Sequence, residues 1–146
     1  MTATDGILIA QALASGAMCG VIWFVQLSHY PSFDLVAGDG RSFARANQRR
    51  TAQVVVPFML VEAATAAILA FSPPPGVPRF AIVAGLALVV ATSLSTAVVQ
   101  MPLHARLARD GHDAATIAAL VRSNWLRTIL WSLRAALAVW MLRVAA

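Results

Sequence analysis

The segment SNWLRTILWSLRAALAVWMLRV, residues 123–144, decides the fold. It is long enough to cross a bilayer, which takes about 20 helical residues. Polar or bulky residues recur on one face of this helix, at Asn124, Arg127, Trp131 and Arg134. A charge at the centre of a membrane helix costs about 3 kcal/mol or more unless it is paired or hydrated. Arg134 therefore predicts that this face turns toward other helices, which must supply its partner.

Composition places the whole chain in the class of integral membrane proteins. The 146 residues are 60% hydrophobic and only 12% charged, and the mean hydropathy is +0.75. These values exclude an ordinary soluble domain. The net charge is +5, and all of the basic residues behind it are arginines. Because the arginines flank apolar segments, membrane topology explains them, and we expect no nucleic-acid partner.

Four apolar segments predict an all-α fold, a single domain over residues 1–146 with four transmembrane helices. We expect spans at about residues 6–29, 51–72, 80–102 and 122–144. Asp39 or Ser42 is expected to cap a helix that continues into the second span, and Asp113 one that continues into the fourth. The two halves share the order span, basic loop, span, but we could align no repeat between them.

The first span carries a Gly-x-x-x-Gly motif at Gly16 and Gly20. Such spacing lets two helix backbones approach closely. In a protein with several spans we expect it to serve packing inside the bundle, with a homo-oligomer as the alternative. Trp23 and Tyr30 are expected to be anchors at the membrane interface.

The distribution of arginine predicts the orientation in the membrane. Most arginines lie in or next to the loops after the first and third spans, whereas Arg79 and Arg143 lie at the opposite end. The positive-inside rule then places both termini outside. We expect a bacterial inner-membrane protein whose partners are the lipid bilayer and a small lipophilic molecule.

Polar residues on every span are expected to meet near the cytoplasmic end of the bundle. Candidate substrate-binding residues are Gln26, Gln100, Glu62 and Arg134. Glu62 lies about 16 Å and Arg134 about 18 Å into their spans, at 1.5 Å per residue. The two charges are thus level, which predicts neighbouring second and fourth helices. A structural ion pair and the wall of a substrate or proton cavity are both open interpretations.

His29 and His104 end the first and third spans and raise the hypothesis of a bound metal or haem. Two imidazoles and a carboxylate would suit iron, copper or zinc, and haem needs only one or two axial ligands. The other interpretation is that both are amphipathic interfacial side chains, since neither belongs to a metal-binding motif. The cofactor itself cannot be named from the sequence.

The segment Gln100-Met101-Pro102-Leu103-His104-Ala105-Arg106-Leu107, with Asn124-Trp125-Leu126-Arg127-Thr128, resembles motifs of a family of small four-helix membrane proteins that includes the fungal anthrone oxygenases. Residues 102–107 match the family's Pro-Leu-Asn-x-x-Leu element with His104 replacing the asparagine. Asn124 and Arg127 match its Asn-x-x-Arg element. The resemblance implies oxygenation of an activated, polycyclic phenolic carbanion, without implying a definite cofactor.

Two hypotheses of function follow. In the first, the protein is an oxidoreductase or oxygenase acting on a small lipophilic substrate. The catalytic candidates are then His29, His104, Asn124 and Arg127, with a histidine as base or ligand and the last two stabilising negative charge. In the second, it is a non-enzymatic binding or assembly protein whose polar residues hold the helices together.

Overall fold

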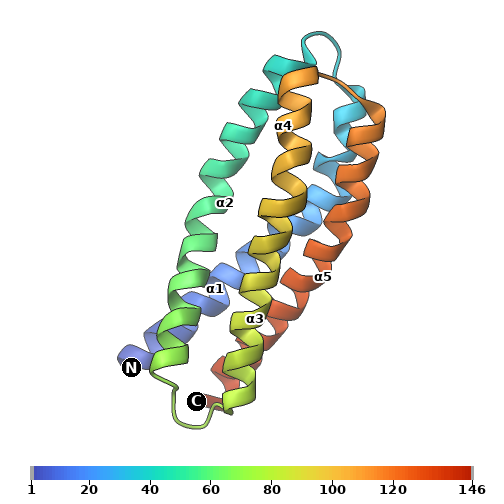
Figure 1. Cartoon of the computed structure of the whole chain (residues 1–146). Helices are drawn as coiled ribbons and strands as arrows, with labels where there is room; N and C mark the ends of the chain where they lie inside the picture. The colour runs from blue at the N-terminus through green and yellow to red at the C-terminus, as the bar shows by residue number, and fades with distance from the viewer. Residues whose placement is uncertain (1, 146) are drawn as a thin grey trace.

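The computed structural model describes residues 2–145, which form a four-helix bundle. Its four long helical segments are each long and apolar enough to span a membrane. Their elements are α1 (Ala3–Phe24), η1 (Val25–His29), η2 (Pro31–Leu35), α2 (Gly40–Phe71), α3 (Arg79–Ser95), η3 (Thr96–Gln100), α4 (Met101–Asp110) and α5 (Ala114–Ala145). The chain ends lie at one end of the bundle and the two arginine-rich loops at the other (Figure 1).

The second and fourth spans extend beyond their apolar parts, as expected from their capping residues. The Asp39 carboxylate accepts hydrogen bonds from the backbone N–H groups of Arg41 and Ser42. The Asp113 carboxylate accepts one from the N–H of Ala115. Hydrogen bonds, chiefly from the hydroxyls of Ser42 and Thr116, lower the pKa of these two carboxyls. Both caps are therefore charged at neutral pH and start helices of 32 residues each.

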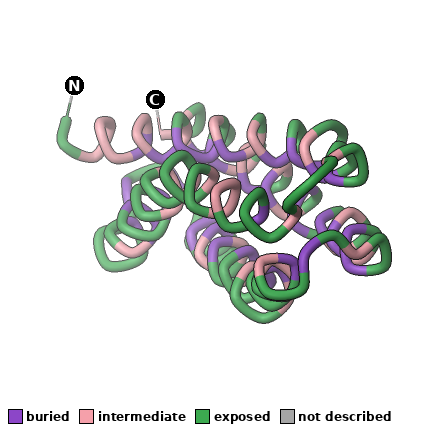
Figure 2. Tube along the Cα trace, turned by 90° about the horizontal axis from the view of Figure 1, so that it is seen from above, coloured by how far each residue is buried: buried purple, intermediate pink, exposed green. Residues whose placement is uncertain are grey.

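The helices form a square in which diagonal helices make no backbone contact. α1 packs against α2 and α5, and α3 packs against the same two helices. Buried positions face the interior and exposed positions face outward, where lipid would lie (Figure 2). The predicted inward face of α5 is confirmed, because Asn124, Arg127, Trp131 and Arg134 are all buried.

Glu62 and Arg134 form an ion pair in the centre of this square. The Nε atom of Arg134 donates to Oε2 of Glu62 over 2.8 Å, and both side chains are 0% exposed. The Ser15 hydroxyl donates to the other carboxylate oxygen. The predicted pairing is confirmed, but the predicted contact between the second and fourth helices is wrong. α2 and α5 are diagonal partners that make no backbone contact, so the two long side chains meet across the core.

Gly85 on α3 provides the space that this crossing needs. A Cβ atom at Gly85 would lie 2.7 Å from Nη1 of Arg134, well inside van der Waals contact. The guanidinium therefore passes against the bare backbone of α3. Any larger residue at Gly85 would have to displace a side chain already held by Glu62.

The interpretation of Gly16 and Gly20 as a packing motif inside the bundle is wrong. Both glycines are exposed, and a Cβ atom on either would meet no atom within 4 Å. The inward face of α1 is instead formed by Leu8, Gln11, Ser15, Met18 and Ile22, which are spaced three and four residues apart. The two glycines lie outside that stripe, on the outer face of α1.

The two halves of the chain follow a similar order of elements, although no repeat is aligned from the sequence. Each half has a span that ends in a five-residue π turn, followed two residues later by Pro31 or Pro102. Each connecting loop contains a glycine with positive φ, 87° at Gly38 and 89° at Gly111. Each half then continues into a 32-residue helix. The square packing fits a pseudo-twofold axis that exchanges α1 with α3 and α2 with α5.

A short sequence repeat accompanies this symmetry. Asn47-Gln48-Arg49-Arg50-Thr51 on α2 and Asn124-Trp125-Leu126-Arg127-Thr128 on α5 share the pattern Asn-x-x-Arg-Thr. The two copies differ in surroundings, since Arg50 is exposed and Arg127 is buried. The two copies are also out of register with the structural correspondence, since Asn47 and Asn124 are 77 residues apart whereas Pro31 and Pro102 are 71 apart.

The central ion pair predicts strong coupling between Glu62 and Arg134. Glu62→Gln or Arg134→Gln alone should lower the free energy of unfolding in detergent by about 3–5 kcal/mol, because one buried charge remains unpaired. The double variant should lose much less than the sum. The exposed pair Arg106–Asp113, at 3.6 Å, is the matched control and should show coupling below about 1 kcal/mol. Additive losses at Glu62 and Arg134 would contradict this reading.

Candidate functional site

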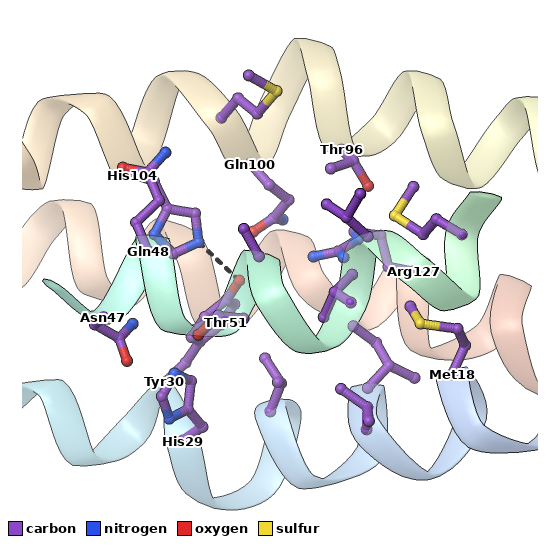
Figure 3. A pocket seen from close by; sticks show the side chains of 18 residues that line it. Met18, His29, Tyr30, Asn47, Gln48, Thr51, Thr96, Gln100, His104 and Arg127 are labelled. Carbon is purple, nitrogen blue, oxygen red and sulfur yellow. Dashed lines mark hydrogen bonds between the residues drawn. The ribbon is translucent and has the colours of Figure 1, made fainter. Parts of the chain in front are cut away.

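A cavity of about 260 Å³ lies in the half of the bundle next to the arginine-rich loops. Half of its lining residues are apolar and come mainly from α1 and α2, among them Met18, Val55 and Met59, and most of the lining surface is apolar. The polar lining residues are His29, Tyr30, Asn47, Gln48, Thr51, Thr96, Gln100, His104 and Arg127 (Figure 3). An apolar cavity with a few polar groups is the usual form of a small-molecule site.

The cavity opens on the outer surface of the bundle. Three of its lining residues are exposed there, Ala52 and Val56 on α2 and Met101 on α4. All three are apolar, and α2 and α4 are packed neighbours. The opening is therefore an apolar seam within the membrane-spanning part of the chain, which suits entry from lipid.

Two π turns shape the wall of this cavity. In η1 the N–H of Tyr30 donates to the carbonyl of Val25, five residues earlier, over 3.0 Å. The wider turn directs Val25, Gln26 and Tyr30 all inward, and all three are buried. In η3 the widened turn ends at Gln100, just before Pro102, which leads into α4. π turns inside helices are frequent at functional sites.

Arg127 is the only cation that lines the cavity among the described residues. Its side chain is 6% exposed, and its Nη1 atom donates to Oδ1 of Asn124 over 3.1 Å. The Asn124 amide donates in turn to Oε1 of Gln26 over 3.0 Å, and Gln26 donates to the carbonyl of Val121. None of the described carboxylates pairs with Arg127. The network holds a buried positive charge in place without neutralising it.

Tyr30 and His104 form a hydrogen-bonded pair on the cavity wall. The Tyr30 hydroxyl and Nε2 of His104 are 2.9 Å apart, as the dashed line in Figure 3 marks. The rings of His29 and Phe33 pack edge to face beside Tyr30. Nε2 of His29 is buried and has no hydrogen-bond partner among the described residues. A proton can pass between the tyrosine and His104 without either side chain moving.

The site does not fit a metal held by His29, His104 and Glu62. Nε2 of His104 is engaged by Tyr30, and both oxygens of Glu62 are engaged by Ser15 and Arg134. Over residues 2–145, no three His, Cys, Asp or Glu side chains gather in a group that could hold a metal ion. The polar groups of the cavity are better suited to an organic ligand.

The structure brings most of the candidate residues together but divides them into two sites. His29, His104, Gln100 and Arg127 line the cavity, while Asn124 and Gln26 lie behind Arg127 and hold it. Glu62 and Arg134 do not line the cavity and form the separate core network.

Five polar residues that line the cavity are absent from the sequence-predicted site: Tyr30, Asn47, Gln48, Thr51 and Thr96. Tyr30 was expected at the membrane interface, but it is only 4% exposed, because the π turn directs it inward. Asn47 was not among the candidates, although its place in the Asn-x-x-Arg-Thr pattern repeated at Asn124 was a usable signal.

Comparison of the chain with protein-family models, curated proteins and solved structures found no match. A function is therefore inferred from the geometry of the cavity.

The network behind Arg127 predicts different roles for the two asparagines of the Asn-x-x-Arg-Thr pattern. Asn124→Leu should destabilise the protein by about 1–3 kcal/mol for each group left unpaired, here Nη1 of Arg127 and Oε1 of Gln26. Asn47 makes no hydrogen bond to another described residue, so Asn47→Leu should change stability by less than about 0.5 kcal/mol. Thermal unfolding of both variants in detergent checks this, and equal losses would contradict it.

Proposed function

We propose that this protein is a membrane oxidoreductase that binds a small lipophilic phenol or enol in the cavity and oxygenates it. The observation that carries the proposal is the buried, unneutralised Arg127 at the wall of an otherwise largely apolar cavity. Such a charge costs several kcal/mol to bury, and a ligand oxygen bearing negative charge would offset that cost. The apolar lining would hold the hydrocarbon body of the ligand.

The arrangement supports a reaction that begins with proton removal. His104, hydrogen-bonded to Tyr30, is suited to accept a proton from an activated C–H group. Arg127 would stabilise the oxyanion that forms when the carbanion delocalises onto a ligand oxygen. The resemblance to the anthrone oxygenase-like family agrees with this assignment, because Asn124 and Arg127 match its Asn-x-x-Arg element.

The proposed reaction balances with dioxygen as the only co-reactant. A methylene carbon between aromatic rings loses a proton to His104 and gives a carbanion. The carbanion transfers its electrons to O₂ and forms a carbon–oxygen bond, and the hydroperoxide takes up the proton. Loss of water then leaves a ketone, so that each CH₂ group consumes one O₂ and releases one H₂O.

The same cavity supports a second candidate, a non-enzymatic protein that binds a lipophilic acid. The observation in its favour is that the Ser15–Glu62–Arg134 network lies apart from the cavity. Those intramembrane polar residues are then structural. Saturable ligand binding without oxygen consumption distinguishes this candidate from the oxygenase.

Activity should depend on the cavity residues. With 1,8-dihydroxyanthrone as probe, the purified protein should accelerate oxygen uptake and formation of the quinone. Arg127→Gln should lower the rate about 100-fold, the usual effect of removing one oxyanion donor. His104→Phe should lower it about 100-fold or more by removing the base. Arg122→Gln, an exposed arginine on the same helix, is the matched control and should retain the rate.

A rate no higher than that of the Arg127→Gln protein or of empty detergent would contradict the oxygenase proposal. An absorption spectrum and metal analysis of the same preparation test the haem and metal hypothesis on His29 and His104. A haem absorption band at stoichiometric intensity would favour a haem-dependent reaction over the cofactor-free reaction.

We further propose that the protein lies in a bacterial inner membrane with both termini outside. The support is that the loops at residues 36–39 and 111–113 share one end of the bundle with most of the arginines, while the chain ends share the other (Figure 1). A phosphatase reporter fused after residue 146 should be active, and one inserted in the loop at residues 36–39 should be inactive. The opposite pattern would reverse the orientation.

A further inference from the structure

The side-chain amide of Gln100 has only one possible orientation in this structure. The Ser123 hydroxyl donates its single proton to the backbone carbonyl of Ala119 over 2.7 Å. It can therefore only accept from Gln100, whose Nε2 atom lies 2.9 Å away. Because Nε2 of Gln100 is directed at Ser123, its Oε1 atom must point away from Ser123.

That oxygen is a buried acceptor without a donor. Gln100 is 1% exposed and lines the cavity, and its Oε1 atom has no partner among the described residues. Figure 3 shows its amide turned into the space between Tyr30 and Arg127. Leaving a buried acceptor unpaired costs about 1–3 kcal/mol, so a donor on a bound molecule would restore this energy.

Comparison with Gln26 shows what is unusual about Gln100. Gln26 is also a buried glutamine in a π turn, and both of its amide atoms are used, by Val121 and Asn124. Gln100 has a partner for its amide nitrogen alone. The cavity therefore lies where a buried amide oxygen has no donor among the described residues.

We infer that Gln100 is a specificity-determining residue that accepts a hydrogen bond from a ligand hydroxyl, so that the ligand is a lipophilic molecule with two oxygen groups. One oxygen is held by Arg127, and the second carries the proton donated to Gln100. The inference rests on the proposed ligand site, and it narrows the ligands to dihydroxy compounds and their close analogues. A molecule whose only oxygen binds Arg127 as an oxyanion has no proton to donate and would leave Oε1 of Gln100 unpaired.

The test compares one phenol with its diols. Binding of 2-naphthol and of 2,3-, 1,8- and 2,7-dihydroxynaphthalene is measured by calorimetry on the purified protein in detergent, with empty micelles subtracted. At least one diol should bind about five- to tenfold more tightly than 2-naphthol, the value of one net hydrogen bond. Gln100→Met, which keeps the side-chain volume, should bind the diol no more tightly than 2-naphthol.

Gln11→Met is the matched control. Gln11 is also 1% exposed with an unpaired Oε1, but it does not line the cavity. It should retain the preference for the diol, and any loss of stability that it shares with Gln100→Met is then a general effect of removing a buried glutamine.

The outcomes separate the two proposals. If the diol preference is absent, or persists in Gln100→Met, this inference is overturned, and a water molecule is the partner of Oε1. If Arg127→Gln still weakens every ligand in that case, the proposed function stands. If none of the naphthols binds the wild-type protein saturably, the proposed function fails and the inference fails with it.

Discussion

The structure depends on two opposite charges that meet in the centre of an apolar bundle. Neither Glu62 nor Arg134 could remain in a membrane-spanning helix alone, since either charge would cost several kcal/mol. Because the pair crosses the diagonal, it does more than join two neighbours. It requires α2 and α5 to face each other, Ser15 of α1 to reach the carboxylate, and Gly85 of α3 to yield space. One ion pair thus specifies the rotation of all four spans.

The sequence predicted the fold well because its signals are local. The length of the apolar segments, the caps at Asp39 and Asp113, and the polar face of α5 each depend on spacing along one helix. The prediction from the sequence failed where the fold depends on how the helices are placed relative to one another. The level depths of Glu62 and Arg134 predict adjacency of α2 and α5, but an arginine side chain is long enough to cross a core where a glycine faces it. Gly16 and Gly20 were misassigned because their spacing does not show which face of α1 turns inward.

Only part of the candidate site was predicted, because here too the signals in the sequence are local to single helices. His29, His104 and Gln100 were found because they end spans that reach the same end of the bundle, and Arg127 because it is polar in an apolar helix. Tyr30 was missed because a π turn changes which residues face inward, and nothing in residues 25–29 signals that turn beyond the nearby Pro31. The division into a core ion pair and a separate cavity requires knowledge of which groups already have partners, and this depends on the folded structure.

The π turns suggest how a cavity arises in a bundle of this kind. A π turn accommodates one more residue than an α-helical turn, so it corresponds to an insertion within a helix. Both π turns lie where the first helix of each half approaches its basic loop, and the cavity lies beside them. A chain of the same design without the extra residue would carry straight helices and a closed interior at this level.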